Sequence, residues 1–311
     1  MGGWCCSRPS ARCRPGGGCS KVAGRVLDLT RLLPGPLAGL VLERLGFEVL
    51  RVLPPAGDDL ARWQPATHAW LNEGKASVTL DLKSASGRER LLELVRGAEV
   101  LLESNRAGVM ERLGLGYPVL SRHNPHLVYV RLAGHRDDPA APGHDLTYLA
   151  ASGLLDRLTS AWSETQLADV SGGLWAALAA LDGLRRGGGF YEVYLSEAAN
   201  VYGYPPIPGL GGELVAYRIY QAAAGRVALA ALEPHLWARF CTAAGRPDWL
   251  DARTDPAREE SRTFRELRAF FRTRDAGAWE AWGREHGLPL RALRPFTPDP
   301  LGLPWQRKEE P

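Results

Sequence analysis

Residues 25–53 read RVLDLTRLLPGPLAGLVLERLGFEVLRVL, and this stretch decides the fold. Its first five residues are typical of a strand, and Phe47–Val52 is typical of a second one. Between them, Pro36 suits the first position of a helix, where the N–H that proline lacks is not needed. Apolar residues then recur three or four positions apart, and Gly46 suits the C-terminal end of that helix. The stretch therefore predicts a strand–helix–strand unit.

The same alternation continues along the next eighty residues. A helix that ends at Val95 follows the strand-like run Ser77–Leu82, and Val100–Glu103 and Leu127–Leu132 resemble two more strands. Repeated strand–helix–strand units form a parallel sheet with helices on both faces. We therefore expect a large Rossmann-like α/β domain over residues 22–190, with ligands at the carboxyl ends of its strands.

The pattern changes after Gly143. One helical stretch from Trp162 to Leu184 is expected, with a break around residues 171–173, where two glycines stand together. The strand-like and helix-like runs that follow predict a smaller α+β domain over residues 191–290, with strands at 191–196 and 226–232. A Pro-rich C-terminal tail, residues 291–311, is expected to return to the large domain.

Composition excludes several classes of protein. The 311 residues carry 38 basic and 35 acidic side chains, a net charge of +3, which is too small to indicate nucleic-acid binding. No apolar run reaches the roughly 20 residues of a membrane helix. The first twenty residues also lack the apolar core of a secretory signal, so we expect a cytoplasmic protein without a membrane partner.

Four of the five cysteines lie in the first 21 residues, a leader rich in Arg, Gly and Pro. Their spacing matches no paired Cys-x-x-Cys motif, so no metal site is predicted. We expect residues 1–21 to be a disordered leader, and an alternative start at Val22 would make it a mis-called segment.

Two positions could carry chemistry by their local sequence alone. His144 stands in the turn Pro-Gly-His-Asp beside Asp145, and Asp169 stands between apolar residues at the start of a helix. A histidine held by a turn can be tuned for proton transfer, but many such histidines are surface residues. Asp169, like Glu233 at the start of a later helix, is equally compatible with a helix-capping carboxylate.

Six ordered segments change that balance, because together they resemble the family III CoA-transferase group, closest to alpha-methylacyl-CoA racemases. They are residues 26–51, 71–83, 100–116, 143–154 (GHDLTYLAASGL), 167–173 (LADVSGG) and 232–237 (LEPHLW).

The resemblance implies roles for individual residues. In the transferase branch, Asp169 is a nucleophile that forms a mixed anhydride and passes CoA to a second carboxylate. In the racemase branch, Asp169 and His144 exchange the α-proton through an enolate, with Glu233 in the acid–base network and Asp145 orienting His144. Coenzyme A enters as part of the thioester substrate, and no permanently bound cofactor is implied. The CoA-binding positions implied are Arg51, Lys75, Arg106, Gly108, Asp145 and Tyr148.

Because His144 and Glu233 are both present, the sequence favours a racemase acting on 2-methylacyl-CoA thioesters, with backbone donors near Asp169 holding the enolate oxygen. The alternative is a transferase, which needs no histidine. A third hypothesis is a CoA-binding protein without turnover, since Glu73 replaces the family's usual basic residue. The resemblance also implies an interlocked homodimer, with sites between the large domain of one chain and the small domain of its partner.

Overall fold

The computed structural model describes residues 23–139, 141–158, 165–203, 205, 208–295 and 301–305. The chain divides into two compact units, one of residues 1–204 and 300–311 and the other of residues 205–299. The predicted leader, residues 1–21, and the alternative start at Val22 lie outside the described residues.

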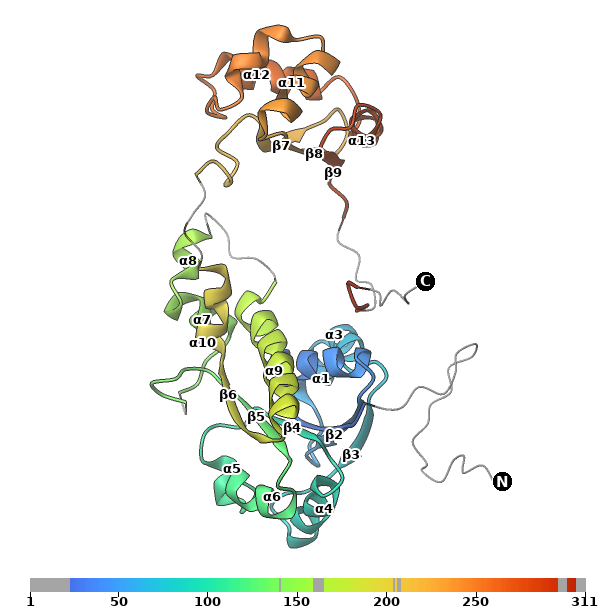
Figure 1. Ribbon diagram of the computed structural model, residues 1–311, viewed down its shortest axis with the longest axis vertical. Helices are drawn as coiled ribbons and strands as arrows, with labels where there is room; N and C mark the ends of the chain where they lie inside the picture. Colours follow the sequence, from blue (N-terminus) through green and yellow to red (C-terminus); the bar gives the residue numbers. More distant parts are fainter. Residues whose placement is uncertain are drawn as a thin grey trace, which may run out of the picture. The chain divides into compact units, whose positions relative to one another are not determined.

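A six-stranded parallel sheet forms the centre of the larger unit (Figure 1). Its order is β3-β2-β1-β4-β5-β6, so the chain builds outward on one side of β1, then returns and builds outward on the other. The order reverses between β1 and β4, and open α/β sheets bind ligands at such a reversal. The expected parallel α/β sheet is confirmed. Its strands are β1 (Arg25–Leu29), β2 (Glu48–Leu53), β3 (Ala76–Thr79), β4 (Val100–Glu103), β5 (Val128–Ala133) and β6 (Gly189–Tyr194).

Helices cover both faces of this sheet. On one face α1 (Pro34–Arg44), α7 (Asp145–Ala151) and α9 (Leu167–Arg186) share a core with Val26 and Leu102. On the other face α4 (Ala85–Val95), α5 (Val109–Arg112) and α6 (Tyr117–His123) pack over Leu27 and Leu101. Because both faces are buried, the central strands are mostly apolar. Short connecting helices are α2 (Asp59–Trp63), α3 (Pro65–Leu71), α8 (Leu154–Arg157), α10 (Leu195–Ala198) and η1 (Ala199–Tyr202).

The helix α9 is continuous, so the predicted break around residues 171–173 was wrong. Its two glycines serve close packing instead. A Cβ on Gly173 would lie 2.6 Å from the carbonyl oxygen of Pro34, and one on Gly172 would lie 2.2 Å from a methyl group of Leu195. The glycines therefore let α9 approach α1 and α10 closely.

Within the described residues, α9 is also the one helix long and apolar enough to cross a membrane. Length and composition alone are weak grounds, because core helices of globular domains share them. Here α9 packs against α1, β5 and β6 and contributes to the buried core, as such a core helix does.

The smaller unit is built on a three-stranded antiparallel sheet, ordered β7-β8-β9. Its helices enclose a core rich in aromatic rings, among them Trp237, Phe240 and Trp279. Its elements are β7 (Tyr217–Gln221), β8 (Arg226–Ala230), α11 (Pro234–Ala243), η2 (Pro247–Ala252), α12 (Arg262–Phe271), α13 (Ala276–Glu285) and β9 (Leu290–Ala292).

Two strands shift the boundaries predicted from the sequence. The strand expected at 191–196 in the small domain is β6, which pairs in parallel with β5 of the large sheet. The small sheet also continues past residue 290, because β9 pairs with β8. Residues 301–305 group with the larger unit, where Arg44 Nε donates to the carbonyl oxygen of Leu301 at 2.7 Å.

Candidate active site

A cavity of about 520 Å³ opens at the carboxyl ends of the large sheet's strands. Its wall includes residues that follow successive strands: Arg31 after β1, Asp58 after β2, Arg106 after β4 and Gly134 after β5. The fold therefore brings four predicted site residues to one cavity, namely Arg106, His144, Tyr148 and Asp169.

Asp169 is the third residue of α9 and lies on this wall. The positive end of the helix dipole favours its ionised form, but burial acts against it. Burial, together with the nearby charge of Asp145, raises the pKa of the Asp169 carboxyl to about 7. Near neutral pH the group is thus present both as acid and as carboxylate, as a group that takes part in chemistry often is.

Asp145 is bonded to the start of α9. Its Oδ1 accepts the backbone N–H of Asp169 at 3.0 Å, and burial raises the pKa of its carboxyl while the N–H groups of Asp169 and Ala168 oppose that rise. Asp145 therefore orients Asp169, whereas the sequence predicted that it would orient His144. The Asp169 N–H is thus engaged by Asp145, and the role of other backbone donors near Asp169 in holding an enolate oxygen stays a prediction.

His144 is exposed and caps α7. Its backbone N–H donates to Thr147 Oγ1 at 3.1 Å, and that hydroxyl donates back to the His144 carbonyl oxygen at 2.8 Å. These two bonds fix the backbone of His144, so the imidazole is carried by a defined helix start on the cavity wall.

The buried ring of Tyr148 lies between two glycines. A Cβ on Gly134 would lie 2.9 Å from Tyr148 Cε1, and one on Gly143 would lie 2.5 Å from it, so neither position accommodates a side chain. Burial and the charges of Asp169 and Asp145 raise the pKa of Tyr148 to about 12. At neutral pH the phenol is thus a hydrogen-bond donor.

Positive charge on the wall comes from Arg31 and Arg106. The backbone N–H of Arg31 donates to Ser104 Oγ at 3.2 Å, which ties the turn after β1 to the turn after β4. Arg31 directly follows β1, a position where the sequence predicts contact with a ligand, although the family resemblance assigns it no role. Two guanidinium groups suit the phosphate and pyrophosphate groups of coenzyme A.

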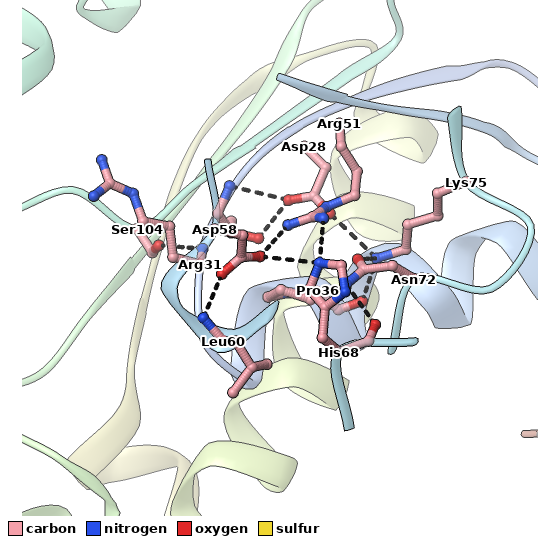
Figure 2. A network of polar contacts seen from close by, with 11 residues as sticks. Asp28, Arg31, Pro36, Arg51, Asp58, Leu60, His68, Asn72, Lys75 and Ser104 are labelled. Atoms are coloured by element: carbon pink, nitrogen blue, oxygen red, sulfur yellow. Dashed lines mark hydrogen bonds and ion pairs between the residues drawn. The ribbon is translucent and has the colours of Figure 1, made fainter. Parts of the chain in front are cut away.

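Arg51 and Lys75, predicted as phosphate contacts, are buried behind this wall (Figure 2). The side chain of Lys75 is 0% exposed and its Nζ lies 3.3 Å from Asp28 Oδ2 and 2.6 Å from the Pro36 carbonyl oxygen. Arg51 donates to Asp58 Oδ2 at 2.5 Å. Both cations already neutralise a carboxylate and are not among the residues that line the cavity, so they support the wall, and their contact with coenzyme A stays a prediction.

Two predicted residues remain: Gly108, which stands between the wall residues Arg106 and Val109, and Glu233, which belongs to the smaller unit. Gly108, at φ +80, caps α5, and this left-handed backbone explains the glycine. Glu233 is an exposed residue at the start of α11 in the smaller unit. Its carbonyl oxygen accepts from the N–H groups of Leu236 and Trp237 at 3.0 Å, and its place in an acid–base network stays a prediction.

The family described as CoA-transferase family III matches residues 23–190 and 192–297. The chain belongs to this family. Members act on CoA thioesters without a bound cofactor, so this protein is an acyl-CoA enzyme. In the described part of the chain, no group of three or more His, Cys, Asp and Glu side chains could hold a metal ion.

Among curated family III relatives, a probable fatty acyl-CoA transferase of Mycobacterium tuberculosis, Rv3272, is 33% identical over 79% of this chain and 74% of its own length. The succinyl-CoA:mesaconate CoA-transferase of Haloarcula hispanica is 32% identical over 72% of this chain and 67% of its own. Human alpha-methylacyl-CoA racemase is 41% identical, but over only 43% of this chain and 34% of its own length. Likeness along most of the chain is thus to transferases.

A crystal structure of Rv3272 resembles this fold with a TM-score of 0.76 and 28% identity, and covers 88% of this chain and 83% of that one. A crystal structure of an aspartate-to-alanine mutant of Rv3272 has a TM-score of 0.74 and 27% identity over 88% of this chain and 82% of that one. The family III assignment and the likeness in fold therefore agree.

Proposed function

We propose that this enzyme transfers coenzyme A between two carboxylic acids, with Asp169 as the carboxylate that carries the acyl group. The observation that carries the proposal is likeness over more than two thirds of the chain to relatives named as CoA-transferases. The racemase prediction made from the sequence has weaker support, because the human racemase matches less than half of the chain.

The reaction needs one nucleophilic carboxylate and a binding site for coenzyme A. Ionised Asp169 attacks the thioester carbonyl and expels the CoA thiolate, which leaves a mixed anhydride. The thiolate then attacks the Asp169 carbonyl and releases the donor acid, giving an aspartyl thioester. An acceptor carboxylate repeats the two steps in the reverse sense, takes CoA and restores Asp169. Arg31 and Arg106 are the cavity cations suited to hold the CoA phosphates meanwhile.

The test is to trap the anhydride and thioester intermediates with hydroxylamine. The enzyme is incubated with a fatty acyl-CoA donor and neutral hydroxylamine, and the peptide containing residue 169 is examined by mass spectrometry. We expect a hydroxamate at Asp169 that needs the acyl-CoA donor. Transfer between paired carboxylic acids without any modification at Asp169 would contradict the mechanism, and the Glu93→Gln enzyme, changed at an exposed carboxylate on α4, serves as control.

A racemase is the second candidate, because the cavity wall also holds His144, the second group that α-proton exchange needs. A 2-methylacyl-CoA in deuterated water separates the two. Deuterium at the α-position that disappears in His144→Ala would favour the racemase, whereas a transferase keeps its activity in that variant.

We also propose that the functional unit is a homodimer, as the family resemblance implies. Exposed apolar side chains on α9, among them Leu174, Trp175 and Leu178, support it, because such a group is a common subunit interface. If each variant alone is inactive, mixing Asp169→Asn and Glu233→Gln chains tests both parts: restored activity would mean that the two residues act across the interface, and a monomeric mass by light scattering would contradict the dimer.

A further inference from the structure

Three buried carboxylates stand at the ends of neighbouring strands around the cavity: Asp28 in β1, Asp58 after β2 and Glu103 in β4. Each accepts the backbone N–H of the residue two positions later and so shapes a turn in or next to the cavity wall. The donors and distances are Thr30 N at 3.0 Å, Leu60 N at 2.9 Å and Asn105 N at 2.6 Å.

Two of the three carboxylates have a cation and the third has none. Asp28 is paired with Lys75 and Asp58 with Arg51 (Figure 2). Within the described ranges, no cation forms an ion pair with Glu103, which is 1% exposed. Its remaining neighbours are neutral donors: Asn105 Nδ2 at 3.1 Å from Oε2 and Tyr129 OH at 3.2 Å from Oε1.

The positions of the nearby charged groups explain why Glu103 has no ion-pair partner among the described residues. Arg131 is its register partner on β5, but the guanidinium of Arg131 is bonded to Glu192 on β6 and lies 3.4 Å from Glu111 on α5. Alternation along the strands places Asp28 and Lys75 on the opposite, α1 side of the sheet. Burial therefore prevails and raises the pKa of Glu103 to about 7, although Asn105, Arg131 and Tyr129 oppose it.

The turn that Glu103 holds contains Arg106 and is bonded to the turn that contains Arg31. Asn105 and Arg106 belong to the first of these turns, and Ser104 Oγ accepts the backbone N–H of Arg31. In the described part of the chain, the neighbours of the Glu103 carboxylate, Asn105 and Tyr129, donate to it, so protonation weakens bonds that a charged acceptor strengthens.

We propose that Glu103 is a pH-sensitive positioning residue: its carboxylate holds the Ser104–Arg106 turn, and its protonation loosens the grip of Arg31 and Arg106 on phosphate groups. The inference rests on the proposed function, because it takes coenzyme A as the ligand of the cavity. It concerns binding, so its effect falls on the KM of the acyl-CoA more than on kcat.

The experiment is calorimetric titration with coenzyme A at pH 8 and pH 6. Wild-type affinity should fall about tenfold at pH 6, since about one carboxylate in ten stays ionised one unit below its pKa. In Glu103→Gln the amide oxygen accepts from Asn105 at both pH values, so most of this fall should disappear. Glu93→Gln, an exposed carboxylate paired with Arg90 on α4, is the control and should keep the wild-type ratio.

The outcomes separate the inference from the function it rests on. An equal fall in wild type and Glu103→Gln would overturn the inference and assign the pH effect to the phosphates of coenzyme A. No binding by the wild type at pH 8 would overturn the proposed function itself. Glu103→Leu should bind weakly at both pH values, and if it does not fold, the Gln variant still decides the question.

Discussion

Two regions at the same edge of the sheet differ in how their buried carboxylates are neutralised. Beside α1, Asp28 and Asp58 each have a buried cation within ion-pair distance. At the junction of α7 and α9, burial raises the pKa of both Asp145 and Asp169, the charge of Asp145 adds to the rise at Asp169, and no ion pair to either is found among the described residues. The first region is therefore fixed structure, whereas the second keeps a group that changes protonation near neutral pH.

Replacing the carboxylate in the second region should have the largest effect. Asp169→Asn removes the nucleophile and keeps the shape, so turnover should fall by about a thousandfold or more. The fold should persist, because the substitution removes a partly buried charge. Steady-state transfer assays and thermal melting check the two parts.

Glu93→Gln is the matched control, since Glu93 is an exposed carboxylate on α4 that is paired with Arg90. Its turnover should match the wild type. If Asp169→Asn retained more than a tenth of wild-type turnover, the role of Asp169 as nucleophile would be excluded.

Removing a cation from the first region should cost stability and not chemistry. Lys75→Met leaves Asp28 buried without its partner, which typically costs about 3–5 kcal/mol. The burial that lowers the pKa of Lys75 is opposed chiefly by Asp28, so the two depend on each other. Urea unfolding of Lys75→Met should therefore show a much lower midpoint, whereas Lys83→Met, at an exposed lysine, should change little.

The double variant Asp28→Leu/Lys75→Met sharpens this test. Removing both charges should recover part of the lost stability, although Gly39 leaves a space shaped for them: a Cβ there would lie 2.8 Å from Asp28 Oδ2 and 2.9 Å from Lys75 Nζ. A double variant less stable than Lys75→Met would mean that Lys75 does not serve chiefly to neutralise Asp28.

The sequence predicted the parallel sheet, but it did not predict the buried ion pairs that support the cavity wall. Buried strands bounded by turns identify themselves through continuous apolar runs, and Asp169 and His144 stand in recognisable motifs. The burial of Lys75 could not be predicted, because a lysine after a glycine resembles a surface residue until Asp28, 47 positions earlier, is known to face it. The edge strand β6 was misplaced, because its half-buried residues carry no signal of the sheet they join.

The pH dependence of kcat should also distinguish the two regions, with a smaller change in rate than the Asp169→Asn substitution causes. Attack needs ionised Asp169, and its pKa is raised to about 7, so kcat should fall about tenfold per pH unit below 7 and level off above it. The contribution of Asp169 to the stability of the fold has the opposite pH dependence. A raised folded-state pKa stabilises the fold below the ordinary pKa near 4, and that contribution is lost as the pH rises towards 7 and above.

Asp169→Asn should therefore gain stability relative to the wild type as the pH rises from 4 to 8, which thermal melting across that range can show. A constant difference in melting temperature would mean that Asp169 titrates at its ordinary pKa. A bell-shaped profile of kcat, with a second group losing a proton above 7, would favour the racemase candidate instead.

The smallest expected effect concerns how the second region keeps its shape without ion pairs. Tyr148 fits against Gly143, and an alanine there would place its Cβ 2.5 Å from the ring, so the ring or the start of α7 must shift. Gly143→Ala should cost about 1–3 kcal/mol of stability and raise the KM of the acyl-CoA a few-fold, because the cavity wall at the start of α7 shifts. Tyr148→Leu should relieve the clash, so the double variant should lose less stability than the sum of the two single losses.

The control is Gly277→Ala, at a helical glycine with no atom within 4 Å of a Cβ, and it should stabilise the fold slightly. Strictly additive losses would mean that the glycine and the tyrosine do not depend on each other, and that packing on Tyr148 does not hold His144 in place.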